Sequence, residues 1–224
     1  MSGPNRLAIF DCDGTLVDSQ ANICQAMIAA FATEQIPPPE EAAIRRVVGL
    51  SLVETMRVLL PGESHATHVR LGENYKAAFW KLRAAGQVEE PLFPGIADCL
   101  MAIEADGWLL AVATGKSDRG LLHCLEYHGL AKSFISLQTA DRHPSKPHPS
   151  MIHQAMADAG AAPETTVMIG DTSFDIGMGI AAGCTTVGVA WGYHDPAELF
   201  EEGAHFVADR PDQLPAILRT ASTA

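Results

Sequence analysis

The stretch Leu7-Ala8-Ile9-Phe10-Asp11-Cys12-Asp13-Gly14-Thr15 decides the fold of this chain. Four apolar residues run directly into two carboxylates that stand one residue apart, and a glycine follows them. The apolar run is too short for a helix and is uniformly apolar, which is typical of a strand buried on both faces of a parallel sheet. We therefore expect the two carboxylates at the carboxyl end of a strand, where ligands bind in such sheets.

Further apolar runs repeat this pattern along the chain. They cover residues 109–113 before Thr114-Gly115, residues 166–169 before Gly170-Asp171, and residues 186–189. Helical patterns lie between the runs, at residues 118–128, 149–159 and 175–182. Alternating strands and helices predict an α/β fold with a doubly wound parallel sheet built from right-handed units.

One segment breaks the alternation. Between about residues 19 and 90 we find no strand pattern, only helical stretches at 21–35, 40–48, 52–60 and 65–85, separated by prolines and glycines. We expect residues 1–18 and 91–224 to form the α/β core domain, with residues 19–90 inserted as a small helical cap domain. Residues 16–19 and 87–94 are the expected hinges.

Composition narrows the class of protein. The 224 residues carry a formal net charge of −12, which disfavours binding to nucleic acid or to anionic membranes. The five cysteines form no CxxC pair and are expected to be free thiols of a reducing compartment. The chain starts without a signal-peptide pattern and has no apolar run of membrane-spanning length. We expect a cytoplasmic protein.

The pair Asp11 and Asp13 suits phosphoryl chemistry. One carboxylate can attack phosphorus, the other can act as general acid and base, and both can bind a hard divalent cation. Gly14 permits a close approach of the backbone to a ligand. DxD alone is more often an Asp-rich turn, but DxDGT directly after an apolar strand favours the functional interpretation.

Further polar residues that suit phosphate or cation binding follow the later apolar runs, and one lies just before the helical pattern at residues 149–159. Thr114 and Gly115 can donate to phosphate oxygens, although a plain helix cap at Ser117 or Asp118 explains them too. Lys146 can neutralise a phosphoryl oxygen, the alternative being a solvated surface lysine. Asp171 can complete a cation site, and Asp175 can ligate through water or simply cap its helix.

The order of these motifs resembles the haloacid dehalogenase superfamily. Strand-DxDGT, strand-Thr-Gly, Lys-Pro and strand-GDxxxD cover nearly the whole chain, and the helical insert stands where that family has its alpha-helical cap. The segments at 170–192 and 205–218 are similar to the phosphoglycolate phosphatase-like branch. The resemblance implies a Rossmann-like core.

The resemblance also implies roles for the residues named above. Asp11 would form an aspartyl-phosphate, Asp13 would protonate the leaving alcohol and then activate water, and Thr114 and Lys146 would bind the phosphoryl group. Mg²⁺ would be held by the Asp11 side chain, the Asp13 backbone carbonyl and Asp171, supported by Asp175. Gly14, Thr15, Gly115 and Lys116 would contact substrate. Asp13 favours attack on phosphorus over carbon, because an alkoxide leaving group needs a proton and a halide does not.

The cap is expected to select the substrate. Arg45 or Arg46 could face a substrate carboxylate, with Lys116 a second candidate; the alternative interpretation is two solvated helix arginines. We expect an Mg²⁺-dependent phosphatase, monomeric or homodimeric, that hydrolyses a small phosphorylated metabolite such as phosphoglycolate. The alternatives are a beta-phosphoglucomutase-like sugar-phosphate mutase, an inorganic pyrophosphatase and a non-catalytic phosphate-binding module.

Overall fold

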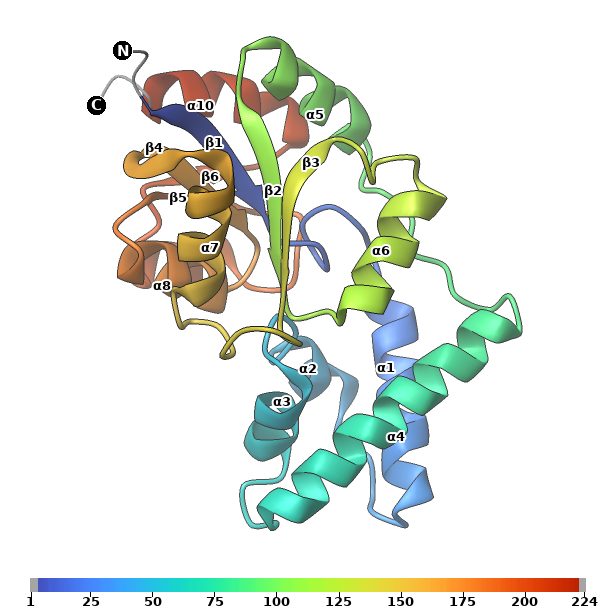
Figure 1. Cartoon of the computed structure of the whole chain (residues 1–224). Helices are drawn as coiled ribbons and strands as arrows, with labels where there is room; N and C mark the ends of the chain where they lie inside the picture. The colour runs from blue at the N-terminus through green and yellow to red at the C-terminus, as the bar shows by residue number, and fades with distance from the viewer. Residues whose placement is uncertain (1–3, 222–224) are drawn as a thin grey trace.

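A parallel sheet forms the centre of the computed structural model, which describes residues 4–221 (Figure 1). Its six strands lie in the order β3-β2-β1-β4-β5-β6, and every neighbouring pair is parallel. In chain order they are β1 (Asn5–Phe10), β2 (Leu109–Thr114), β3 (Phe134–Thr139), β4 (Ala161–Gly170), β5 (Thr185–Val189) and β6 (Phe206–Ala208). The predicted doubly wound α/β fold is confirmed. The structure also contains two edge strands, β3 and β6, that we did not predict from the sequence.

The apolar side chains of β1 alternate between two cores. Ala8 and Phe10 pack in one core with α5 (Ile96–Ala105), α6 (Asp118–Tyr127) and α10 (Leu214–Ala221). Leu7 and Ile9 pack in the other with α7 (Ser150–Ala159) and α8 (Ser173–Ala181). Burial on both faces explains why the strand is apolar at successive positions. Two short elements, α9 (Pro196–Glu201) and the 3₁₀-helix Pro211–Gln213, complete this part of the chain.

The order of the strands reverses beside β1. From β1 the chain continues outward through β2 and β3, and β4 then returns to the other side of β1 and leads to β5 and β6. Ligands of open α/β sheets bind outside the carboxyl ends of the strands at such a reversal. The topology therefore points to the ends of β1 and β4.

A helical insert, residues 20–84, lies beyond this edge of the sheet (Figure 1). It contains α1 (Gln20–Thr33), α2 (Glu41–Arg45), α3 (Leu52–Leu59) and α4 (His65–Ala84), which enclose a hydrophobic core of their own. Helix α2 is shorter than the stretch 40–48 we expected, because turns occupy residues 46–49 and Gly49 has a φ of +99°. The domain boundaries at 18/19 and 90/91 stay a prediction. Among the helices of residues 4–221, none has both the length and the hydropathy to cross a bilayer.

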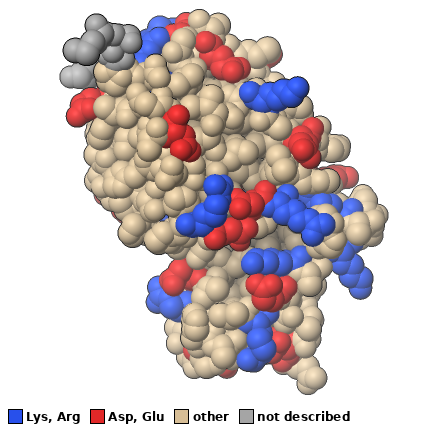
Figure 2. All heavy atoms as spheres, viewed as in Figure 1, with Lys and Arg blue, Asp and Glu red and all other residues tan. Residues whose placement is uncertain are grey.

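Glu90 joins the insert to the sheet. One carboxylate oxygen lies 2.6 Å from Nη2 of Arg83 on α4, and the other lies 2.6 Å from Nζ of Lys116, just after β2. All three side chains are at least nine-tenths buried. Burial alone would raise the pKa of Glu90, but the two cations more than offset it and the pKa is lowered. Figure 2 shows charges of both signs gathered where the insert meets the sheet layer.

Replacing the Glu90 carboxylate tests whether it stabilises the contact between the insert and the sheet. We expect Glu90→Gln to lower the free energy of unfolding at pH 7 by about 3 kcal/mol, because two buried cations lose their counter-charge. The pKa of Glu90 lies below its ordinary value of 4.5 in the folded chain, so this stabilisation is present above pH 4.5 and is lost as the pH falls through the folded-state pKa. Urea unfolding across this range should show the gap between the two proteins narrowing with acid. The exposed neighbour Glu89 supplies the control, since Glu89→Gln should cost little at any pH; equal losses in both variants would contradict the role of Glu90.

Candidate active site

Four loops bring the predicted residues to the carboxyl edge of the sheet. Asp11 directly follows β1, and its backbone N–H donates to the carbonyl of Ile169 on β4 at 2.9 Å, which extends the sheet pairing. Thr114 ends β2, Lys146 lies in the loop between β3 and α7, and Asp171 follows β4. Each of these four side chains is buried. Residues far apart in the sequence thus meet at the reversal in strand order.

The ammonium of Lys146 lies between two carboxylates. Its Nζ is 2.8 Å from Oδ1 of Asp11 and 2.6 Å from Oδ1 of Asp175, and all three side chains are inaccessible to solvent. Burial alone would lower the pKa of Lys146, but the two carboxylates outweigh it and raise the pKa. The lysine therefore stays charged, and the solvated-surface alternative does not apply to it.

Negative charge exceeds positive charge around this lysine. Carboxylate oxygens of Asp11, Asp171 and Asp175 lie within 4.8 Å of one another. Burial first, and repulsion by neighbouring carboxylates after it, raise the pKa of Asp11 to about 7 despite Lys146, and raise the pKa of Asp171 well above its ordinary value. Within residues 4–221, Oδ2 of Asp11 has no hydrogen-bond partner. Oxygen ligands with surplus negative charge fit a hard divalent cation.

The other two carboxylates of this cluster are held by hydrogen bonds. Thr15 donates from its hydroxyl to Oδ1 of Asp171 at 2.8 Å, and the backbone N–H of Tyr193 donates to Oδ2 at 2.9 Å. Asp175 accepts at Oδ2 from the backbone and hydroxyl of Thr172, in a capping box that starts α8. Asp175 thus both caps its helix and contacts Lys146. Thr15 thus holds Asp171 through its hydroxyl, and its predicted contact with substrate stays a prediction.

Two glycines allow close approaches at this edge. Gly14 has a φ of +87°, and a Cβ there would stand 2.2 Å from Oδ2 of Asp171. At Gly115 a Cβ would stand 2.7 Å from the carbonyl oxygens of Gly49 and Leu50, in the turn of the insert after α2. The first glycine makes room for the carboxylate cluster, and the second lets the insert pack directly on the loop after β2.

Asp13 is set apart from the carboxylate cluster. Oδ1 of Asp13 lies 2.8 Å from Nζ of Lys116 and accepts a hydrogen bond from the hydroxyl of Ser19. Lys116, predicted to bind substrate, thus bridges Asp13 and Glu90. The sequence offered no signal for Ser19 or Glu90, because their role depends on how the two ends of the insert return to the sheet.

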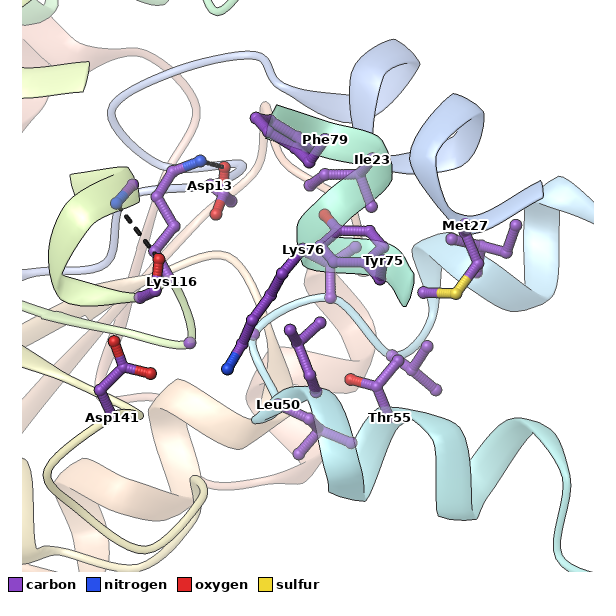
Figure 3. Close-up of a pocket in the computed structure, with 18 of the residues that line it drawn as sticks. Asp13, Ile23, Met27, Leu50, Thr55, Tyr75, Lys76, Phe79, Lys116 and Asp141 are labelled. Atoms are coloured by element: carbon purple, nitrogen blue, oxygen red, sulfur yellow. Dashed lines mark hydrogen bonds and ion pairs between the residues drawn. The ribbon is translucent and has the colours of Figure 1, made fainter. Parts of the chain in front are cut away.

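A cavity of about 340 Å³ lies between the sheet loops and the insert. Figure 3 shows Asp13 and Lys116 on its sheet side, with Tyr75 and Phe79 of α4 among the residues from the insert. Asp11 is fully buried and is not among the lining residues. The cavity therefore reaches the site at Asp13.

The remaining predicted residues have other partners. Arg45 pairs with Glu41 at 3.1 Å, and Arg46 reaches from the insert to Glu198 of α9 at 2.6 Å. Neither arginine lines the cavity, so the structure does not bring them to the site. Thr114 is buried, and its hydroxyl accepts from the backbone N–H of Lys116 at 3.2 Å.

Comparison with known proteins gives relatives that match most of the chain. It is 36% identical over 195 residues to "Probable phosphatase IndB" of Dickeya dadantii, covering 86% of this chain and 84% of that one. It is 28% identical over 220 residues to "Phosphoglycolate phosphatase" of Vibrio vulnificus, covering 93% and 94%. "Tyrosine-protein kinase PtkA" of Mycobacterium tuberculosis is 33% identical over 190 residues, but the chain spans 63% of that relative's length.

Solved structures share the fold. A "predicted phosphatase" from Clostridium acetobutylicum superposes with a TM-score of 0.86 at 24% identity, covering 98% of this chain and all of that one. At this identity the likeness concerns the fold alone. The family described as "Haloacid dehalogenase-like hydrolase" matches residues 8–189, most of the chain. The chain therefore belongs to the haloacid dehalogenase-like hydrolases.

Proposed function

We propose that this hydrolase is a phosphatase that cleaves small phosphate monoesters through an aspartyl-phosphate on Asp11. One observation carries the proposal: Asp11 and Lys146 are in contact at 2.8 Å at the end of β1, with Asp13 held two residues further on beside the cavity. Relatives named as phosphatases support it. A non-catalytic phosphate-binding module would not need Asp13 fixed by Lys116 and Ser19.

The reaction would proceed in two displacements at phosphorus. In the first, a carboxylate oxygen of Asp11 bonds to phosphorus, the bond to the ester oxygen breaks, and Asp13 gives that oxygen a proton. In the second, water bonds to phosphorus while Asp13 takes its proton, and the bond to Asp11 breaks to release phosphate. Lys116 and Ser19 would fix the orientation of Asp13 through both steps.

Two sets of groups would hold the phosphoryl charge. Thr114 and Lys146 would bind the phosphoryl group, while the side chains of Asp11 and Asp171 and the backbone carbonyl of Asp13 would hold Mg²⁺. Bound Mg²⁺ would offset the surplus negative charge and polarise a phosphoryl oxygen. Asp175 would act by holding Lys146, whose Nζ lies 2.6 Å from its Oδ1.

We also propose that residues 19–90 act as a mobile cap. Asp11 is fully buried, so an ester needs an opening to reach it, and a movement of the insert away from the sheet would provide one. The insert has its own hydrophobic core and is suited to move as a unit. Closure would then exclude bulk water while the ester bond breaks.

Phosphate release from a panel of small esters, including phosphoglycolate and pyrophosphate, tests the phosphatase proposal. With Mg²⁺ we expect release from monoesters, its loss on adding EDTA, and no dependence on a bisphosphate activator. Asp11→Asn should abolish release because it removes the nucleophile, and Asp13→Asn should lower it by about 10²–10⁴-fold. Asp98→Asn, on the exposed surface of α5, is the matched control and should retain activity. Undiminished release by Asp11→Asn would sink the proposal.

Thermal unfolding tests the metal site without any substrate. Mg²⁺ at about a hundred times its Kd should stabilise the folded chain by about 2.7 kcal/mol and raise the Tm. Asp171→Asn should remove most of this shift, because it withdraws one of the proposed ligands. The control Glu104→Gln removes an exposed carboxylate from α5 and should leave the shift intact. An equal Mg²⁺ shift in Asp171→Asn would show that the cation binds elsewhere.

A further inference from the structure

Most of the wall of the cavity is apolar and comes from the insert. Ile23 and Met27 lie one turn apart on α1, and Tyr75 and Phe79 lie one turn apart on α4 with ring centroids 5.9 Å apart. Leu50 adds to the wall from the turn after α2 (Figure 3). Aromatic and thioether side chains pack favourably against apolar rings. The wall is therefore suited to a flat apolar group.

The positive charge nearest to Asp13 in this cavity already has anionic partners. Among the lining cations, Lys116 pairs with Asp13 and Glu90, Arg83 pairs with Glu90, and Lys76 pairs with Glu73 at the exposed rim. The guanidinium of Arg119 lies over the ring of Trp80 at 3.3 Å. A carboxylate two atoms from the scissile oxygen would thus lie beside Asp13, where the ammonium of Lys116 is already paired with two carboxylates. Burying a charge without a partner is strongly unfavourable.

The size of the cavity points the same way. Its volume of about 340 Å³ is roughly twice that of a cavity known to hold benzene, about 150 Å³. A two-carbon leaving group would leave most of this apolar space to water. The hydroxyls of Thr55 and Tyr75 line the cavity, and neither has a hydrogen-bond partner within residues 4–221. They offer uncharged polar contacts to a larger group.

Resting on the proposed phosphatase activity, we infer that the cavity binds the leaving group and selects monoesters whose leaving group is uncharged and carries a ring. Esters with a second negative charge, such as phosphoglycolate, would be poor substrates. Burying a ring the size of a phenylalanine side chain favours binding by roughly 10–100-fold. We therefore expect the lining residues to determine which phosphate monoesters have the higher kcat/KM.

Three esters of primary alcohols test this ranking on the unaltered chain. Benzyl phosphate carries a ring, ethyl phosphate is small and neutral, and phosphoglycolate carries a carboxylate. We expect kcat/KM for benzyl phosphate to exceed that of each of the other two by roughly 10–100-fold. Equal or higher kcat/KM for phosphoglycolate would overturn the inference while leaving the phosphatase proposal intact. No release from any of the three would instead count against the phosphatase proposal.

A charged variant provides the second measurement. Leu52 of α3 lines the cavity and is half-buried, so Leu52→Lys places an unpaired cation at its wall. We expect this variant to lower the ratio of kcat/KM for benzyl phosphate over phosphoglycolate at least about tenfold. The control Val58→Lys places the same charge on the same helix, where Val58 is 47% exposed and outside the lining. An unchanged ratio in folded Leu52→Lys would show that the cavity does not receive the leaving group.

Discussion

The buried ammonium of Lys146 is the interaction on which the rest of the site depends. It contacts Asp11 at the end of β1 and Asp175 at the start of α8, two carboxylates that burial would otherwise drive apart or protonate. One ammonium does not balance the three carboxylates of the cluster. Burial first, and repulsion between these carboxylates after it, raise the pKa values of Asp11 and Asp171. This surplus of negative charge fits the further cation that we propose beside Asp11.

The sheet and the insert divide the work of the site. The sheet supplies the charged groups on adjacent strands, where the strand order reverses and backbone ends meet. The insert supplies most of the apolar side chains that line the cavity. Lys116 links the two parts, because the same ammonium contacts Asp13 of the sheet edge and Glu90 of the joint. The position of the insert is therefore coupled to the orientation of Asp13.

The central strands could be predicted because burial on both faces leaves an uninterrupted apolar run, as in β1. The edge strands lack such an apolar run and were not predicted. In β3 buried residues are interrupted by more exposed ones, and β6 is only three residues long. Asp11, Lys146, Asp171 and Asp175 could be picked out because each follows a recognisable motif, and the fold brings them together. The partners of Arg45 and Arg46 could not be predicted from sequence, since a long arginine side chain pairs with whichever acid packs nearby.

By itself the sequence determined the α/β class, the place of the insert and the identities of the carboxylates and lysine that gather at the sheet edge. These follow from local patterns: apolar runs, glycine positions and the residues just after them. Only the tertiary structure decided that Lys116 contacts Asp13 and Glu90, that Thr15 holds Asp171, and that the wall of the cavity is mostly apolar. Such pairings depend on distances between segments remote in the chain, which no local pattern records.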